Sequence, residues 1–295
     1  KLSEIESDVA LTFGQKGAFT SFFGPDLPNL IGVVILTSLG TWGLPQMVHK
    51  FYAIKDEKAI RYGTIISTFF AFVVAGGCYF LGGFGRLFDS PAIYAENGSI
   101  VYDSIIPTML ASLSDMLIGI VIVLVLSASM STLSSLVLTS SSTLTLDFIK
   151  GNVVKDMDDK KQLSCMRLML VFFIVISVII ALDPPTFIAQ LMSISWGALA
   201  GAFLAPFMYG LYWKGVTKAS VWASFATGVL LTVLNMFFKF IASPINAGAI
   251  AMVAGMIVVP LVSFVTPKMD EAKLNDMFVC LEEKVLVSKR KSIEE

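Results

Sequence analysis

The sequence predicts an all-α integral membrane protein. Its 295 residues are 56% hydrophobic, and the mean hydropathy is +0.80. Charged residues make up 15% of the chain, well below the roughly 25% of soluble domains. Apolar segments of about 17 residues or more can cross a bilayer as helices, and the chain has seven: 28–48, 62–84, 116–146, 167–183, 187–212, 219–241 and 247–266.

Basic residues are distributed unevenly between the connections. Of the 21 Lys and Arg residues, 17 lie in the segments 49–61, 150–167, 214–218 and 268–291. Cytoplasmic loops carry an excess of Lys and Arg. We therefore expect the first span to begin outside the cell and the C-terminal tail to be cytoplasmic, as seven alternating crossings require.

The first apolar segment is predicted to be broken. It reads NLIGVVILTSLGTWGLPQMV, with Gly40, Gly43 and Pro45 close together. Glycine and proline at membrane depth free backbone groups, which is tolerated where they line a cavity. Such discontinuous helices are typical of transporter binding sites. A proline kink with small residues for close helix packing is the alternative.

The third apolar segment is unusually rich in hydroxyl groups. In the stretch 127–145, SASMSTLSSLVLTSSSTLT, 12 of 19 residues are Ser or Thr. Ala128, Ser131 and Thr132 are spaced i, i+3 and i+4, so they share one helix face. The segment has no carboxylate, which calcium and magnesium sites usually need, so the pattern favours a monovalent cation. Hydrogen bonding between helices is the alternative, at about 0.6 kcal/mol a bond.

The remaining segments have simpler interpretations. The second is apolar and Gly-rich, as expected of a packing helix, and 86–115 is a long connection. The fourth and fifth segments form a hairpin across Asp183-Pro184-Pro185. The fifth carries Gly197, Gly201 and Pro206 and can bend. Two further spans and a charged tail complete the chain.

Several stretches resemble the sodium:solute symporter family, which includes sodium-coupled sugar, proline, pantothenate and monocarboxylate carriers. The run SASMSTLSSLVLTSSSTLTLDFIK resembles the family's signature helix. The stretch GTWGLPQMVHKFYAIKDEKAIRYG resembles the first helix of its second repeat with the following loop, and GAFLAPFMYGLYWKGVTKASVWAS resembles its last core helix and exit loop. These landmarks extend from Leu30 to Ser224 in the family's order.

The resemblance implies the inverted-repeat fold of the leucine transporter. The chain would supply the second five-helix repeat plus two additional helices, and the missing N-terminal half of the same transporter would be its partner. The implied domains are an extracellular segment, the second repeat, the two additional helices and a cytoplasmic tail: 1–27, 28–213, 214–266 and 267–295.

The resemblance also implies site residues. Sodium, the coupling ion, would bind the Ala128 carbonyl and the hydroxyls of Ser131 and Thr132, with further ligands from the missing half. The solute would lie against small hydroxyl side chains on the broken span and on the fifth span, namely Thr37, Ser38, Thr41 and Ser193.

The function implied is sodium-coupled secondary active symport of a small organic solute across the plasma membrane. Pantothenate, a carboxylate and an amino acid are the candidate solutes. The expected partners are this solute and the lipid bilayer, and not nucleic acid.

Alternatives are a non-transporting sensor or receptor on the same scaffold, and a proton-coupled carrier. Proton coupling generally needs a titratable group in the membrane, which this half does not offer. We expect no enzyme, because the spans contain neither HExxH nor an interior Asp or Glu.

Overall fold

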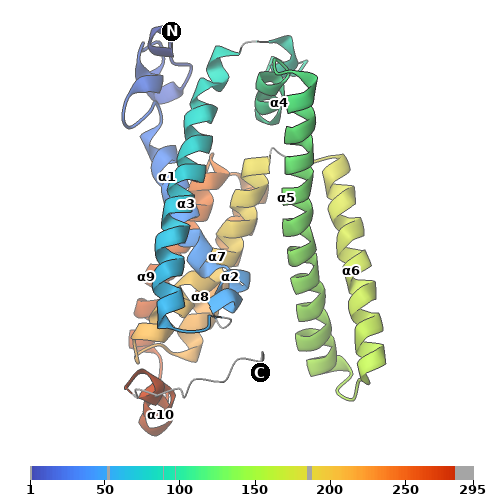
Figure 1. Cartoon of the computed structure of the whole chain (residues 1–295). Helices are drawn as coiled ribbons and strands as arrows, with labels where there is room; N and C mark the ends of the chain where they lie inside the picture. Colours follow the sequence, from blue (N-terminus) through green and yellow to red (C-terminus); the bar gives the residue numbers. More distant parts are fainter. Residues whose placement is uncertain (1, 52–53, 89, 97, 185–187, 283–295) are drawn as a thin grey trace. The chain divides into compact units, whose positions relative to one another are not determined.

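The structure, a computed structural model, describes residues 2–51, 54–88, 90–96, 98–184 and 188–282 (Figure 1). These residues form helices joined by short connections, and the only β pairing among them is two isolated bridges. Six helices are long and apolar enough to cross a membrane. The predicted all-α integral membrane fold is therefore confirmed.

The chain divides into two compact units, which are described separately. Unit 1 comprises residues 1–26 and 52–191, and unit 2 comprises residues 27–51 and 192–295. The first apolar segment, although it precedes most of unit 1 in the sequence, therefore packs with the last helices of the chain.

Unit 1 contains three long helices and one short one: α3 (Glu57–Gly83), α4 (Ile105–Leu110), α5 (Asp115–Ser142) and α6 (Asp159–Leu182). The Asp56 carboxylate caps α3 by accepting a hydrogen bond from the Ala59 N–H at 2.7 Å. The helices α5 and α6 lie side by side as a hairpin (Figure 1).

The helix α5 does not end where its apolar run ends. It continues directly into a π-helix, η7 (Thr143–Val153), although the span was predicted to stop at residue 146. Ser141 and Thr145, one turn apart across this junction, are both fully buried. Such wide turns are rare and frequently occur at functional sites.

The N-terminal segment of unit 1 is folded against the end of α3. It contains three short 3₁₀ turns, η1 (Leu2–Glu4), η2 (Ala10–Thr12) and η3 (Ala18–Thr20). Arg86, in η4 (Phe84–Leu87), forms an ion pair with Asp8 at 2.9 Å. The Arg86 guanidinium also lies 3.9 Å from the centre of the Phe19 ring. One cation thus ties two parts of this segment to η4, which directly follows α3.

Unit 2 is built around the interface of α1 with the last apolar helices. Its helices are α1 (Leu27–Gly43), α2 (Pro45–Phe51), α7 (Ile188–Tyr212, whose first turn belongs to unit 1), α8 (Lys218–Phe238), α9 (Pro244–Val265) and α10 (Glu271–Glu282). Its core contains Leu36, Ala200, Leu204 and Met252. At 17 residues, α1 is shorter than the other spans, and the chain breaks at Leu44 before α2. The predicted break is confirmed.

Small residues allow the helices of unit 2 to approach one another closely. A Cβ atom on Gly43 of α1 would lie 2.8 Å from Ala200 of α7. A Cβ atom on Gly197 of α7 would lie 2.6 Å from the Gly248 backbone of α9. Because lipid provides no hydrophobic drive for helix association, such close packing is a main source of stability in a membrane.

Two helices of unit 2 contain an internal proline. A proline lacks the N–H that would bond to the carbonyl four residues earlier. Pro206 therefore frees the Ala202 carbonyl of α7, and the Ser224 hydroxyl of α8 donates to that oxygen at 3.3 Å. Pro260 frees the Met256 carbonyl of α9.

The second freed carbonyl is also paired. The Tyr209 hydroxyl of α7 donates to the Met256 oxygen at 3.1 Å. Each freed carbonyl is thus paired with a side chain from a neighbouring helix. These two bonds join α7, α8 and α9 at the points where proline interrupts the hydrogen bonding of α7 and α9.

The Tyr209 hydroxyl is therefore expected to stabilise unit 2. Tyr209→Phe leaves the Met256 carbonyl without a donor and should lower the free energy of unfolding by about 0.6–1.5 kcal/mol. The measurement is thermal unfolding of the purified complete protein that carries this chain. Tyr212→Phe is the matched control, because Tyr212 lies on the same helix but is 79% exposed. Equal melting temperatures for the two variants would contradict this role.

A second prediction concerns the contact between α7 and α9. Gly197→Ala should destabilise the protein by about 1–3 kcal/mol, since the added methyl group meets backbone atoms that cannot move aside. The control is Gly210→Ala on the same helix, where a Cβ atom would meet nothing within 4 Å. Helix propensity favours both changes equally, so only the packing differs. A destabilisation as large at Gly210 would refute the packing argument.

Candidate functional site

The predicted ion-binding residues lie on one exposed face of α5, in unit 1. Ala128, Ser131 and Thr132 are all exposed. Their shared face follows from the regular α-helical turn, which the structure maintains from Asp115 to Ser142. No other described part of unit 1 packs on this face, so any further ligands of a bound ion would come from outside unit 1.

The hydroxyl groups of α5 fall into two classes. Four of them donate to carbonyls three or four residues earlier in the same helix: Ser134, Thr139, Ser141 and Ser142. The side chains of Ser131 and Thr132 form no hydrogen bond within the described residues, and the same is true of Ser127, Ser129, Ser135 and Ser140. Hydroxyls of this second class can still both donate and accept, whereas those of the first class have given their hydrogen to the helix and keep only their oxygen lone pairs for a ligand.

This donor set fits a monovalent cation. One carbonyl and two hydroxyl oxygens are neutral, hard ligands, and they carry none of the negative charge on which divalent sites rely. Within the described part of the chain, no group of three or more His, Cys, Asp or Glu residues is placed to hold a metal ion. Ala128, Ser131 and Thr132 could thus supply part of a sodium site.

One buried hydroxyl in this region was not singled out from the sequence. Thr145 is fully buried in η7, and its Oγ1 has no hydrogen-bond partner in the part of the chain that the structure describes. Close by, Lys150 donates to the Gln162 side chain at 2.6 Å and so joins η7 to α6. The density of Ser and Thr could have drawn attention to Thr145, but no pattern in the sequence distinguishes it from its neighbours.

The predicted solute-binding residues lie in unit 2 and differ in their surroundings. Thr37 and Thr41 are half-buried on α1, and their hydroxyls donate to the Val33 and Ser38 carbonyls at 2.7 and 3.2 Å. Ser38 is exposed, and its hydroxyl forms no hydrogen bond among the described residues. Ser38 therefore has the hydroxyl best placed to meet a solute.

Ser193 is fully buried on α7. A Cβ atom added to Gly248 of α9 would lie 2.9 Å from the Ser193 carbonyl oxygen, so this part of α7 packs directly against α9. The structure therefore encloses Ser193 in the interior of unit 2, unlike the three predicted residues of α1.

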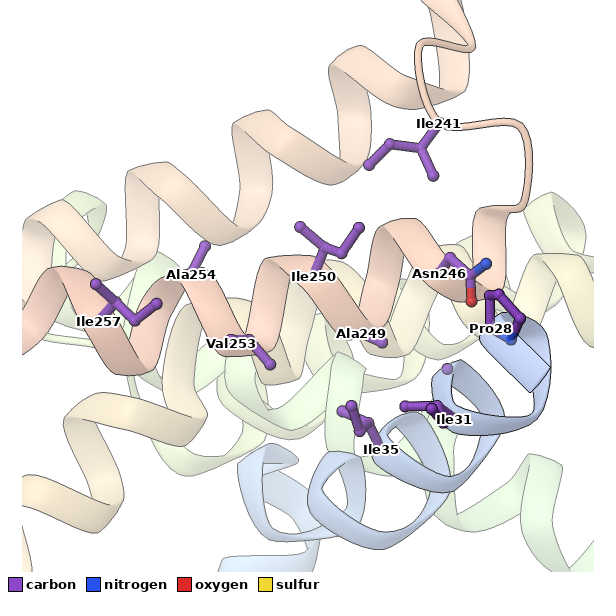
Figure 2. A pocket seen from close by; sticks show the side chains of 11 residues that line it. Pro28, Ile31, Ile35, Ile241, Asn246, Ala249, Ile250, Val253, Ala254 and Ile257 are labelled. Atoms are coloured by element: carbon purple, nitrogen blue, oxygen red, sulfur yellow. The ribbon is translucent and has the colours of Figure 1, made fainter. Parts of the chain in front are cut away.

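The cavity described in unit 2 is not lined by any of these four residues. It has a volume of about 490 Å³ and lies between α1, α9 and the α8–α9 turn. Figure 2 shows its lining residues, among them Ile31 and Ile35 on α1 and Ile250 and Ile257 on α9. Sequence reasoning did not identify this cavity, because it depends on the pairing of two helices that are distant in the chain.

Comparison with known proteins locates the chain among transporters. The model of the sodium:solute symporter family matches residues 25–228. This range includes the broken α1–α2 segment, α5 and α7, which carry all the predicted site residues. No solved structure matches the chain significantly.

Curated relatives agree with the family match. The sodium/pantothenate symporter of Haemophilus influenzae is 28% identical over 264 residues, which are 86% of this chain and 52% of the relative. The sodium/proline symporter of Staphylococcus aureus is 27% identical over 257 residues, which are 82% of this chain and 48% of the relative. The chain thus spans about half the length of these relatives, which are named as symporters and not as enzymes. With more than two thirds of its residues inside the family match, this multi-pass membrane chain belongs to the sodium:solute symporter family.

Proposed function

We propose that the protein carrying this chain moves a small organic solute across the plasma membrane together with sodium ions. The single observation that carries this proposal is the exposed, unpaired hydroxyl pair of Ser131 and Thr132 on α5, in a chain of the sodium:solute symporter family. The sodium gradient and the membrane potential drive transport. The potential alone supplies about 2.3 kcal/mol per charge per 100 mV.

Sodium is held by the Ala128 carbonyl and by the hydroxyls of Ser131 and Thr132. The remaining ligands come from the half of the transporter that the chain does not include. Sodium bound between the two parts ties α5 to that half and so organises the solute site. Because coupling between two bound ligands is reciprocal, sodium and solute raise each other's affinity.

The solute binds beside the break between α1 and α2. Pro45 has no N–H to donate to the Thr41 carbonyl, so the regular hydrogen bonding of the helix is interrupted beside the proposed solute site. Ser38 contributes a hydroxyl, Thr37 and Thr41 extend the polar surface of α1, and the enclosed Ser193 would reach the solute only if α7 and α9 move apart. The relatives named above carry pantothenate and proline, which both have a carboxylate. A small carboxylate-bearing solute is therefore the class that we propose for this chain.

The topology follows the inverted-repeat scheme. Residues 28–213 form the second repeat, 214–266 add two helices, and 267–295 form a cytoplasmic tail, of which 283–295 lie outside the described residues. The segment 1–27 is extracellular. The distribution of Lys and Arg supports this orientation.

The sodium assignment predicts a specific defect. Ser131→Ala combined with Thr132→Ala removes two ion ligands and should raise the sodium concentration for half-maximal uptake by about 10-fold or more, since a hydrogen bond or ligand contact to a charge contributes about 1.5–3 kcal/mol. Uptake of radiolabelled proline or pantothenate by the complete protein in proteoliposomes measures this effect.

The control for this experiment is Thr139→Ala combined with Ser142→Ala. These residues lie about 10 and 15 Å beyond Thr132 along α5, too far to share its ion, so sodium dependence should not change. If the first pair of substitutions leaves sodium dependence intact, the assignment is wrong. If a pH gradient drives uptake without sodium, the carrier is proton-coupled.

The solute assignment is tested at Ser38. Ser38→Ala should raise the KM for solute about 2- to 10-fold, corresponding to one hydrogen bond of 0.5–1.5 kcal/mol, and leave kcat nearly unchanged. Ser67→Ala on α3 is the control, because the Ser67 hydroxyl donates to the Thr64 carbonyl at 3.2 Å. An unchanged KM for Ser38→Ala would exclude this hydroxyl from the solute site.

A further inference from the structure

The cavity between α1 and α9 is an elongated and almost entirely apolar groove. Its lining along α9 runs from Asn246 to Ile257, a distance of about 16 Å at 1.5 Å per residue. Its volume is about 490 Å³. An elongated apolar groove of this volume can hold a hydrocarbon chain.

One side of the groove is open. Ile250, Val253 and Ile257 of α9 line it and remain exposed at 46%, 39% and 54%. Ala249 and Gly32 form part of its floor and are buried. Since α9 is one of the candidate membrane spans, the open side lies at membrane depth, where an apolar occupant is expected.

The groove has one polar end. Figure 2 shows the side-chain amide of Asn246 beside Pro28, at the opposite end of the row from Ile257. Asn246 lies in the first turn of α9, near the boundary of the span. Its Oδ1 atom is buried against Gly32, which also lines the groove, and accepts no hydrogen bond from the described residues. A buried acceptor without a donor costs about 1–3 kcal/mol, so a bound molecule that supplies an N–H or O–H group would offset this cost.

The surroundings of this end are polar and carry a positive charge. The Ser243 hydroxyl donates to the Asn29 side chain at 2.6 Å and joins the α8–α9 turn to α1. On the same turn, Lys239 is exposed at the C-terminus of α8, two residues before the groove-lining Ile241. An ammonium group near the span boundary suits the phosphate of a phospholipid.

We propose that this groove binds one acyl chain of a membrane glycerophospholipid whose head group donates a hydrogen bond to Asn246. Phosphatidylethanolamine and phosphatidylglycerol have such donors, whereas phosphatidylcholine has none. A protein helix could supply this donor only from its first turn or from a polar side chain, because its other backbone N–H groups are already bonded. This inference does not depend on sodium coupling or on the solute.

Native mass spectrometry of the complete protein tests the proposal. The protein is reconstituted in bilayers of equal parts phosphatidylethanolamine, phosphatidylglycerol and phosphatidylcholine, then released in mild detergent, and the lipids that remain bound are counted. We expect the two donor lipids to be retained about 2- to 10-fold more than phosphatidylcholine, as one hydrogen bond allows. Asn246→Leu should bring this ratio to about one. The Asn246 oxygen has no protein partner, so this change breaks no hydrogen bond of that atom within the described residues.

A filling variant tests the acyl chain. Ala254→Phe places a ring in the groove and should remove one retained lipid, whereas Ala226→Phe, on an exposed position of α8 outside the groove, should not. If the filling variant does not fold, the Asn246→Leu ratio still decides the case. Equal retention of all three lipids by the unmodified protein would overturn the proposal.

Photocrosslinking distinguishes whether lipid or protein occupies the groove. With p-benzoylphenylalanine in place of Val253, adducts should be lipids enriched in the two donor head groups, and the same residue at Ala226 should capture lipids in the proportions of the bilayer. Adducts between position 253 and another segment of the protein would show that protein covers the groove, and the proposal would be wrong.

Discussion

The structure depends on one constraint: a backbone carbonyl at membrane depth must have a donor, since neither water nor lipid supplies one. The helices α7 and α9 each contain a proline that frees a carbonyl, and each freed carbonyl is satisfied from outside its own helix. The Ser224 hydroxyl donates to the Ala202 oxygen, and the Tyr209 hydroxyl donates to the Met256 oxygen. The kinks of α7 and α9 are therefore points of connection between helices and not only points of weakness.

The same rule distinguishes the hydroxyls of α5 from one another. Those that donate to their own helix have their hydrogen bonded there, whereas the hydrogens of Ser131 and Thr132 are not bonded within the described residues. A membrane helix rich in Ser and Thr is thus not uniformly polar. Its hydroxyls differ in which of their bonding groups remain free, and composition alone does not reveal this difference.

Much of this arrangement could be predicted from the sequence. The lengths of the apolar runs located the spans, and the grouping of Gly40, Gly43 and Pro45 predicted the break that the structure shows at Leu44. The i, i+3, i+4 spacing placed Ala128, Ser131 and Thr132 on one face. These features are local, because each is determined by residues within a few turns of one another.

What could not be predicted depends on contacts between distant residues. The π-helix η7 forms where α5 meets α6, and no residue of the run Thr143–Val153 requires it. The enclosure of Ser193 and the groove at Asn246 both arise from the packing of α9 on helices far earlier in the sequence. No sequence pattern within α9 predicts which helix it will pack against.

The pairing of α1 with α9 has a consequence for biosynthesis. The hydrogen bond between Asn29 and Ser243 joins residues 214 positions apart, which at about 5–20 residues per second correspond to about 10–40 s of translation. Throughout that interval α1 is in the bilayer without its final neighbour, and the face around Gly32 and Gly40 is open to any helix that emerges earlier. The order of synthesis thus makes the first helix of unit 2 one of the last to reach its native contacts, and this delay is the stage at which misassembly competes with folding.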